Sequence, residues 1–125
     1  MFDSLEIIKE TSHKDASLKL NELITQFIEK NKKFNMGLSG GNTPKFFYQT
    51  FAELNQENSD ITLWTIDDRH VHLEDEISNQ GMINSIFNKT KMNILELQFN
   101  EDPNKSAEDY SSCLLYTSDA ADDLL

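Results

Sequence analysis

The chain has 125 residues, a length that fits one domain or part of one, and its apolar content of 38% with eight phenylalanines is sufficient for a packed core. A formal net charge of −11 disfavours nucleic acid or an anionic membrane surface as a partner. Cys113 is the one cysteine, which excludes an internal disulfide framework. No apolar run has the length of a membrane span, and the N-terminus has no signal-peptide core. The composition therefore indicates a cytoplasmic protein.

The first third of the chain predicts a strand, a helix and a second strand. An apolar run at residues 5–8 predicts the first strand. Ser12, with Asp15 three positions later, is typical of a helix N-terminus, and apolar residues recur at helical spacing over 16–28. Residues 34–38 alternate as a half-buried strand does, and they predict the second strand.

A glycine turn follows the second strand in the run Ser39-Gly40-Gly41-Asn42-Thr43-Pro44. The aromatic-rich segment 45–54 predicts a helix that opens with Pro44 at its first position, where the missing N–H has no intrahelical partner to lose. Paired glycines admit close approach of a ligand, and a helix N-terminus offers N–H groups. The run matches neither a dinucleotide-binding fingerprint nor a P-loop, so it predicts another kind of small-molecule site.

The rest of the chain continues the alternation. Residues 61–66 predict a third strand, 82–87 an amphipathic helix, 94–97 a further strand, and Asp102-Pro103 the start of another helix. Strands that alternate with helices at this spacing favour βαβ units. The predicted fold class is therefore α/β, a Rossmann-like parallel sheet flanked by helices.

Polar motifs follow the carboxyl ends of two predicted strands, which is where ligands bind in open parallel sheets. The glycine turn follows one strand, and Asp67-Asp68-Arg69 follows the next. If strand alternation continues, Asp67 and Arg69 point to one side, where they could orient a base or bind a sugar hydroxyl or phosphate. The competing interpretation is an ordinary surface ion pair. Their position beside the turn favours the site.

Several other residues have two interpretations each. His70 and His72 could bind a metal, but no third ligand stands out, so no metal site is predicted. Ser39 lacks the context of a nucleophile and is interpreted as a ligand-contacting hydroxyl. Lys45 is either solvated helix surface or a phosphate contact. The Ser78-Asn79 pair is typical of a helix N-cap, and Asn79 either belongs to that cap or reaches into the crevice.

Three segments resemble the 6-phosphogluconolactonase family in order and spacing. They are the Leu38–Lys45 run LSGGNTPK, the Trp64–Val71 run WTIDDRHV and the Ser78–Met82 run SNQGM. The family carries an S-G-G-S-T-P turn, a D-E-R segment and an S-N pair; Asn42 and Asp68 depart from it mildly. Related aminosugar-phosphate deaminases follow a similar turn with D-E-Y, so Arg69 favours the lactonase. The resemblance covers about residues 1–112.

The resemblance implies hydrolysis of 6-phospho-D-glucono-1,5-lactone in the oxidative pentose phosphate pathway, with no metal or organic cofactor. It places Asp67 and Arg69 in the catalytic machinery. Substrate-binding positions carried over from the family, or expected at the rim of the site, are Ser39, Gly40, Gly41, Asn42, Thr43, Lys45 and Asn79. The family's general base is a histidine in a later G-x-G-x-D-G-H segment that this chain lacks, so this N-terminal part is expected to have little activity.

Residues 113–125 resemble a translated sequencing adapter, and they are interpreted as a non-native tail; the competing interpretation is a genuine helix. Three other functions stay open. An aminosugar-6-phosphate deaminase or isomerase would release ammonia from its substrate. A non-catalytic sugar-phosphate sensor would carry a DNA-binding segment, for which residues 1–12 are too short and too poor in basic residues. A complete flavodoxin-like binding domain would leave the ordered match of three motifs unexplained.

Overall fold

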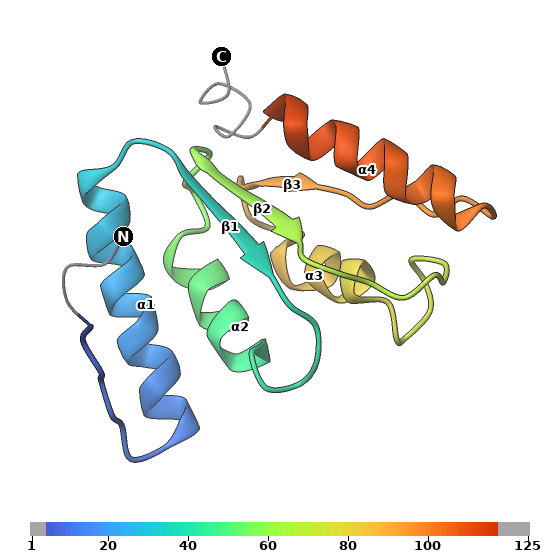
Figure 1. Cartoon of the computed structure of the whole chain (residues 1–125). Coiled ribbons are helices and arrows are strands. Elements are labelled where there is room, and N and C mark those ends of the chain that lie inside the picture. Colours follow the sequence, from blue (N-terminus) through green and yellow to red (C-terminus); the bar gives the residue numbers. More distant parts are fainter. Residues whose placement is uncertain (1–4, 118–125) are drawn as a thin grey trace.

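The computed structural model describes residues 5–117, in which three parallel strands alternate with four helices (Figure 1). This confirms the α/β, Rossmann-like layering expected from the sequence. In chain order the elements are α1 (His13–Lys30), β1 (Phe34–Leu38), α2 (Lys45–Leu54), β2 (Ile61–Thr65), α3 (Asn79–Phe87), β3 (Asn93–Leu95) and α4 (Pro103–Thr117).

The strands lie in the order β1-β2-β3, with α2 and α3 as the two crossover helices. Phe34 is opposite Ile61 and Leu38 is opposite Thr65, so β1 and β2 end level with each other. The glycine turn begins directly after β1, and the Asp67–Arg69 segment begins two residues after β2 ends. The register therefore brings the glycine turn and the Asp67–Arg69 segment to the same edge of the sheet.

Helices α1, α2 and α3 cover one face of the sheet (Figure 1), where the alternating inward residues of β1 and β2 meet their apolar stripes. Phe51, Ile61, Leu63 and Ile83 are fully buried there. Aromatic rings from two helices fill the centre, with Phe51 and Phe87 in edge contact at 6.5 Å between centroids. This packed core holds β1 and β2 in place. It thereby also fixes the position of the segments that follow their carboxyl ends.

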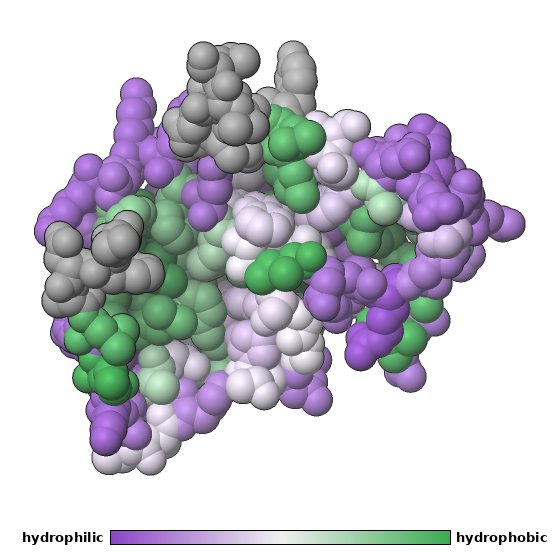
Figure 2. All heavy atoms as spheres, viewed as in Figure 1, coloured by the Kyte–Doolittle hydropathy of each residue, from purple (hydrophilic) through white to green (hydrophobic). Residues whose placement is uncertain are grey.

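Apolar side chains also lie at the surface. Leu20, Leu23 and Phe27 recur along α1 at helical spacing and are each more than a third exposed. Figure 2 shows apolar side chains gathered over the region of α1 and β1. On the sheet, the Trp64 ring lies against Gly37, and Ile66 is 57% exposed. Exposed apolar surface of this kind favours association, so the isolated chain is expected to aggregate readily.

The strand predicted at residues 5–8 is wrong. The described chain has no strand before β1, and Leu5 and Ile7 are 84% and 71% exposed. An apolar run becomes a strand only when a neighbouring strand accepts its backbone N–H groups and donates to its C=O groups. Residues 5–10 have no such neighbour among the described residues, so the apolar pattern is not sufficient.

The predicted helix starts are confirmed at three helices, including α4, which begins at Pro103 as expected, and shifted at a fourth. The Ser12 hydroxyl accepts the Asp15 N–H at 3.1 Å, and the Ser78 hydroxyl accepts the Gly81 N–H at 2.9 Å. Pro44 is the N-cap of α2 and not its first helical residue. The helix therefore begins at Lys45, one residue later than expected. The Pro44 carbonyl accepts the Tyr48 N–H at 3.0 Å, so proline still opens the helix.

Helix α4 is attached to the sheet through Tyr110. The Tyr110 hydroxyl accepts the Thr65 N–H at 2.7 Å and donates to the Thr65 carbonyl at 2.9 Å. The hydroxyl thus pairs both the backbone N–H and the carbonyl of Thr65, the last residue of β2, which has no partner in β3. Burial raises the pKa of this hydroxyl above its ordinary value, although its hydrogen bonds to Thr65 act in the opposite direction.

We expect the chain to lose stability as pH rises above the ordinary tyrosine pKa of about 10. The folded pKa of Tyr110 is the higher one, so the unfolded state loses its proton first. The stabilisation is therefore complete below the unfolded pKa and is lost as pH rises through the folded pKa. Urea unfolding between pH 8 and 11 measures this; Tyr110→Phe should flatten the slope, and an unchanged slope would contradict the assignment.

The expected tail begins inside α4. This helix extends to Thr117, so residues 113–117 continue it, whereas 118–125 lie outside the described residues. The interpretation of residues 113–125 as a non-native tail therefore stays a prediction. None of the described helices combines the length and the apolar run that crossing a membrane requires.

Candidate functional site

The glycine turn is fastened to the helix that follows it. The buried Tyr48 side chain donates its hydroxyl to the Ser39 carbonyl at 2.7 Å, and the Lys45 N–H bonds to the Asn42 carbonyl at 3.2 Å. Gly41 has φ +92°, in the left-handed region that favours glycine. The predicted contact residues Ser39, Gly41, Asn42 and Thr43 are exposed, so the turn presents its backbone and hydroxyls to solvent.

Gly40 lies directly against Asn79. A Cβ at position 40 would overlap the side-chain amide of Asn79. The Asn79 side chain in turn donates its Nδ2–H to the Asp67 carbonyl at 3.1 Å. Asn79 therefore joins the glycine turn to the segment after β2, and the structure brings together three of the motifs that the sequence analysis placed at one edge.

The Asp67–Arg69 segment does not continue the strand. β2 ends at Thr65, so strand alternation no longer orients the two side chains expected to point the same way. Arg69 donates from Nη1 to the Ile77 carbonyl at 2.9 Å, and both Asp67 and Arg69 are exposed. The guanidinium is held at the end of the loop that leads into α3.

Asp68 lies between these residues and binds the N-terminus of α3. Its Oδ1 accepts the Asn79 N–H at 2.7 Å and the Arg69 N–H at 2.8 Å. Its Oδ2 accepts the Gln80 N–H at 2.8 Å and the Ser78 hydroxyl at 3.3 Å. One carboxylate thus holds the two ends of the loop together, which strand alternation gave no reason to expect.

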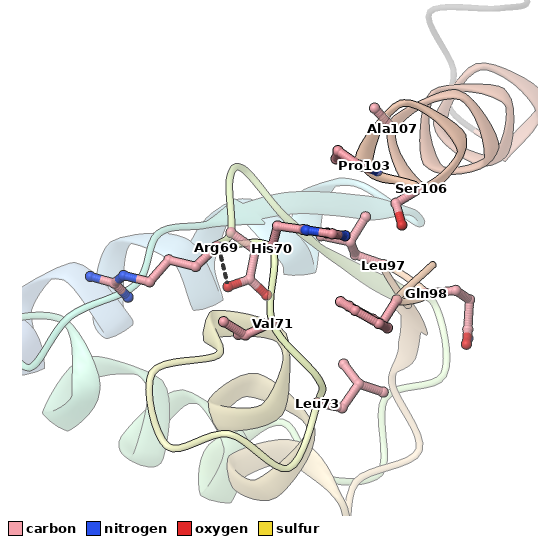
Figure 3. Close-up of a pocket in the computed structure, with 11 residues that line it drawn as sticks. Arg69, His70, Val71, Leu73, Leu97, Gln98, Pro103, Ser106 and Ala107 are labelled. Carbon is pink, nitrogen blue, oxygen red and sulfur yellow. Dashed lines mark hydrogen bonds between the residues drawn. The ribbon is translucent and has the colours of Figure 1, made fainter. Parts of the chain in front are cut away.

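A cavity of about 190 Å³ lies on the α4 side of this loop, lined by Asp68, Arg69 and His70 together with residues of α4 (Figure 3). Pro103, Ser106 and Ala107 form its α4 wall, while the Arg69 side chain extends away from it. Its lining is mostly apolar. The volume is below the range of about 300–1,000 Å³ that is typical of ligand pockets.

The two histidines contact an aromatic ring. The His70 ring stacks on Phe99 with centroids 4.8 Å apart, and the His72 ring lies 4.0 Å from the same ring. His70 Nε2 also bonds to the Asn100 carbonyl at 2.6 Å. Within the part of the chain that the structure describes, no three His, Cys, Asp or Glu side chains are grouped to hold a metal ion.

A second hollow, of about 420 Å³, opens between α2, α3 and the loop that joins β2 to α3. Lys45 and Ser78 line it, as do the acidic residues Glu74, Asp75 and Glu76. Neither Lys45 nor Arg69 forms an ion pair with any of the described residues. Neither cation is neutralised by a described carboxylate, and the Arg69 nitrogens other than Nη1 remain able to bind an anionic ligand.

Reasoning from the sequence missed the residues that hold the site in shape. Strand alternation would turn Asp68 away from Asp67 and Arg69, and no local pattern marks Gln80 as a structural residue. Tyr48 lies in the core, as its apolar segment indicates, and it also holds the turn through the Ser39 carbonyl. Gln80 is fully buried, and its Oε1 accepts the Thr65 hydroxyl at 2.7 Å and the Leu97 N–H at 2.9 Å. A polar residue one position after a helix start gives no local signal of partners 15 and 17 residues away.

Comparison with known proteins identifies the family. The model of the family described as glucosamine-6-phosphate isomerases/6-phosphogluconolactonase matches residues 9–123. The chain belongs to this family. It is 31% identical over 99 residues to a Caenorhabditis elegans protein named "Putative 6-phosphogluconolactonase", an alignment that covers 76% of this chain and 37% of that protein.

Solved structures of family members share the fold. A 6-phosphogluconolactonase from Thermotoga maritima superposes with a TM-score of 0.78 at 23% identity, covering 90% of this chain and 53% of that one. A monomeric glucosamine-6-phosphate deaminase superposes with a TM-score of 0.71 at 16% identity, covering 88% and 50%. The chain thus spans about half the length of these structures, and its fold is common to both activities.

Proposed function

We propose that the protein to which this chain belongs hydrolyses 6-phospho-D-glucono-1,5-lactone to 6-phosphogluconate, as a cytoplasmic enzyme of the oxidative pentose phosphate pathway. The observation that carries the proposal is Arg69, which follows Asp67-Asp68 where the related deaminases have tyrosine, in a family member whose curated relative is named as a lactonase. The proximity of Gly40 to Asn79 supports a single site for the three motifs.

The reaction needs water activated for attack on the lactone carbonyl, and the developing oxyanion must be stabilised. In our proposal, Asp67 and Arg69 assist the base and the substrate, while the turn from Ser39 to Thr43 and the Asn79 amide hold the sugar. The described histidines lie elsewhere: His13 begins α1, and His70 and His72 contact Phe99. We therefore propose that this chain binds the sugar phosphate but hydrolyses the lactone little above the spontaneous rate.

The phosphate is proposed to bind near Lys45, at the start of α2. Lys45 is half-buried, forms no ion pair within residues 5–117 and lies three residues after Asn42, whose carbonyl its N–H contacts. A local cation is required because the net charge of −11 repels an anionic sugar phosphate at long range. The attraction should weaken with added salt, since exposed charges are screened.

We expect 6-phosphogluconate to shift the backbone amide resonances of Gly40, Gly41 and Asn79 in the 15N-labelled chain, whereas glucosamine 6-phosphate does not. Lys45→Ala should weaken the binding of 6-phosphogluconate about tenfold, the loss of one charge-assisted contact. Lys33→Ala, which removes an exposed lysine before β1, is the matched control and should leave binding unchanged. Binding of glucosamine 6-phosphate in preference to 6-phosphogluconate would support the deaminase instead.

A further inference from the structure

Asp68 uses both carboxylate oxygens to hold the two ends of the loop between β2 and α3. It accepts the Arg69 N–H at the start of the loop, and it accepts the Asn79 and Gln80 N–H groups just after its end. We propose that Asp68 is a positioning residue for sugar-phosphate binding, which fixes Asn79 and Arg69 without touching the substrate. The proposal rests on the function proposed above.

The first consequence concerns the N-terminus of α3. The N–H of the N-cap residue Ser78 bonds to the Asp75 carbonyl at 3.0 Å, Asp68 accepts the N–H groups of Asn79 and Gln80, and Ser78 Oγ accepts the N–H of Gly81 at 2.9 Å. Every N–H group that a helix normally leaves unpaired at this end is therefore bound by the protein. The end of α3 has no free N–H for a substrate anion, and only side chains remain for that purpose.

The second consequence concerns the side chain of Asn79. Its backbone is fixed by Asp68 at 2.7 Å, and its amide then reaches both the Asp67 carbonyl and the face of Gly40. If the Asp68 bond is lost, the first turn of α3 is free to shift, and with it the Asn79 amide. Asp68 thus determines where the glycine turn meets the segment after β2.

The third consequence is a requirement for a carboxylate. Four donors converge on Asp68, so both oxygens must accept. An asparagine at this position would turn its NH₂ group toward N–H donors on one side, leaving donors unpaired. Glutamate keeps both acceptors, and the family pattern that this chain resembles has glutamate here. Glutamate should therefore restore what asparagine loses.

The test compares Asp68→Asn, Asp68→Glu and the wild-type chain by amide exchange and by titration with 6-phosphogluconate. In Asp68→Asn we expect faster exchange of the Asn79 and Gln80 backbone amides and a shift of the Asn79 side-chain resonances toward those of an exposed asparagine. We expect binding to weaken about tenfold in this variant and to stay within about twofold of wild type in Asp68→Glu. Asp68→Ser, which keeps one acceptor, substitutes for Asp68→Asn if that variant does not fold.

Ser12→Ala is the matched control, because it removes the N-terminal cap of another helix, α1, and leaves every bond to Asp68 in place. It should lower stability without moving the Asn79 side-chain resonances or the affinity. Unchanged Asn79 resonances in Asp68→Asn would overturn the proposal, as would a loss of affinity in Ser12→Ala equal to that in Asp68→Asn. If the wild-type chain binds no 6-phosphogluconate, the proposed function fails, while the Asn79 resonances still decide the role of Asp68.

Discussion

Replacing Gly40 with alanine is expected to weaken binding of 6-phosphogluconate by about tenfold or more while the chain stays folded. The added Cβ would overlap the end of the Asn79 side chain, a flexible group that can swing away more easily than the backbone can move. Asn79 would then lose its 3.1 Å bond to the Asp67 carbonyl, at a cost of about 1 kcal/mol in stability. Calorimetric titration measures the loss of binding, and urea unfolding measures the small loss of stability.

Two variants separate this overlap from a general effect on the turn. Gly41→Ala meets open space but must adopt φ +92°, so it should cost about 1–2 kcal/mol of strain without touching Asn79. In an Asn79→Ala background, Gly40→Ala should add little to the loss of affinity, because the overlapping group is gone. An equal effect of Gly40→Ala in both backgrounds would mean that the site does not depend on this contact.

Elements whose signals are local could be predicted from the sequence. Ser12 and Ser78 each precede a helix and accept an N–H three residues ahead, so a short window contains the whole interaction. The placement of two polar motifs at one edge was also predictable, because parallel β1 and β2 end side by side and the glycine turn and the Asp67–Arg69 segment follow them. The edge of the sheet where the candidate site lies was thus predictable before any contact was known.

Interactions that depend on distant partners could not be predicted. The run at residues 5–8 has the composition of a strand, but pairing partners decide strand formation, and none lies beside it in residues 5–117. Asp68 meets Asn79 across a loop, and Tyr110 meets Thr65 from 45 residues away. These contacts require the register of the sheet and the position of α4, which no local pattern specifies.

Gln80 is the clearest case of such a distant interaction, and its replacement with leucine is expected to destabilise the chain by about 3 kcal/mol or more. Gln80 Oε1 accepts the Thr65 hydroxyl and the Leu97 N–H, and its Nε2 donates to Asn84 at 3.0 Å. Leucine fills a similar volume but accepts neither donor, so the buried Thr65 hydroxyl and the half-buried Leu97 N–H lose their partner. Because domains of this size are stable by about 5–15 kcal/mol, the loss is a large fraction of the total.

Urea unfolding of two further variants identifies the cause. Thr65→Val in the Gln80→Leu background removes one stranded donor and should recover part of the lost stability. Gln80→Glu keeps an acceptor, but burial should raise the pKa of the new carboxyl, so its stabilising contribution is present at low pH and is lost as pH rises through that folded pKa. A Gln80→Glu chain that is as stable as wild type at pH 8 would show that the pocket around Gln80 is open to water. No recovery in the Thr65→Val double variant would assign the cost of Gln80→Leu to packing rather than to unpaired hydrogen-bond donors. The carboxyl edge of the sheet is thus expected to depend on a buried amide as much as on its apolar core.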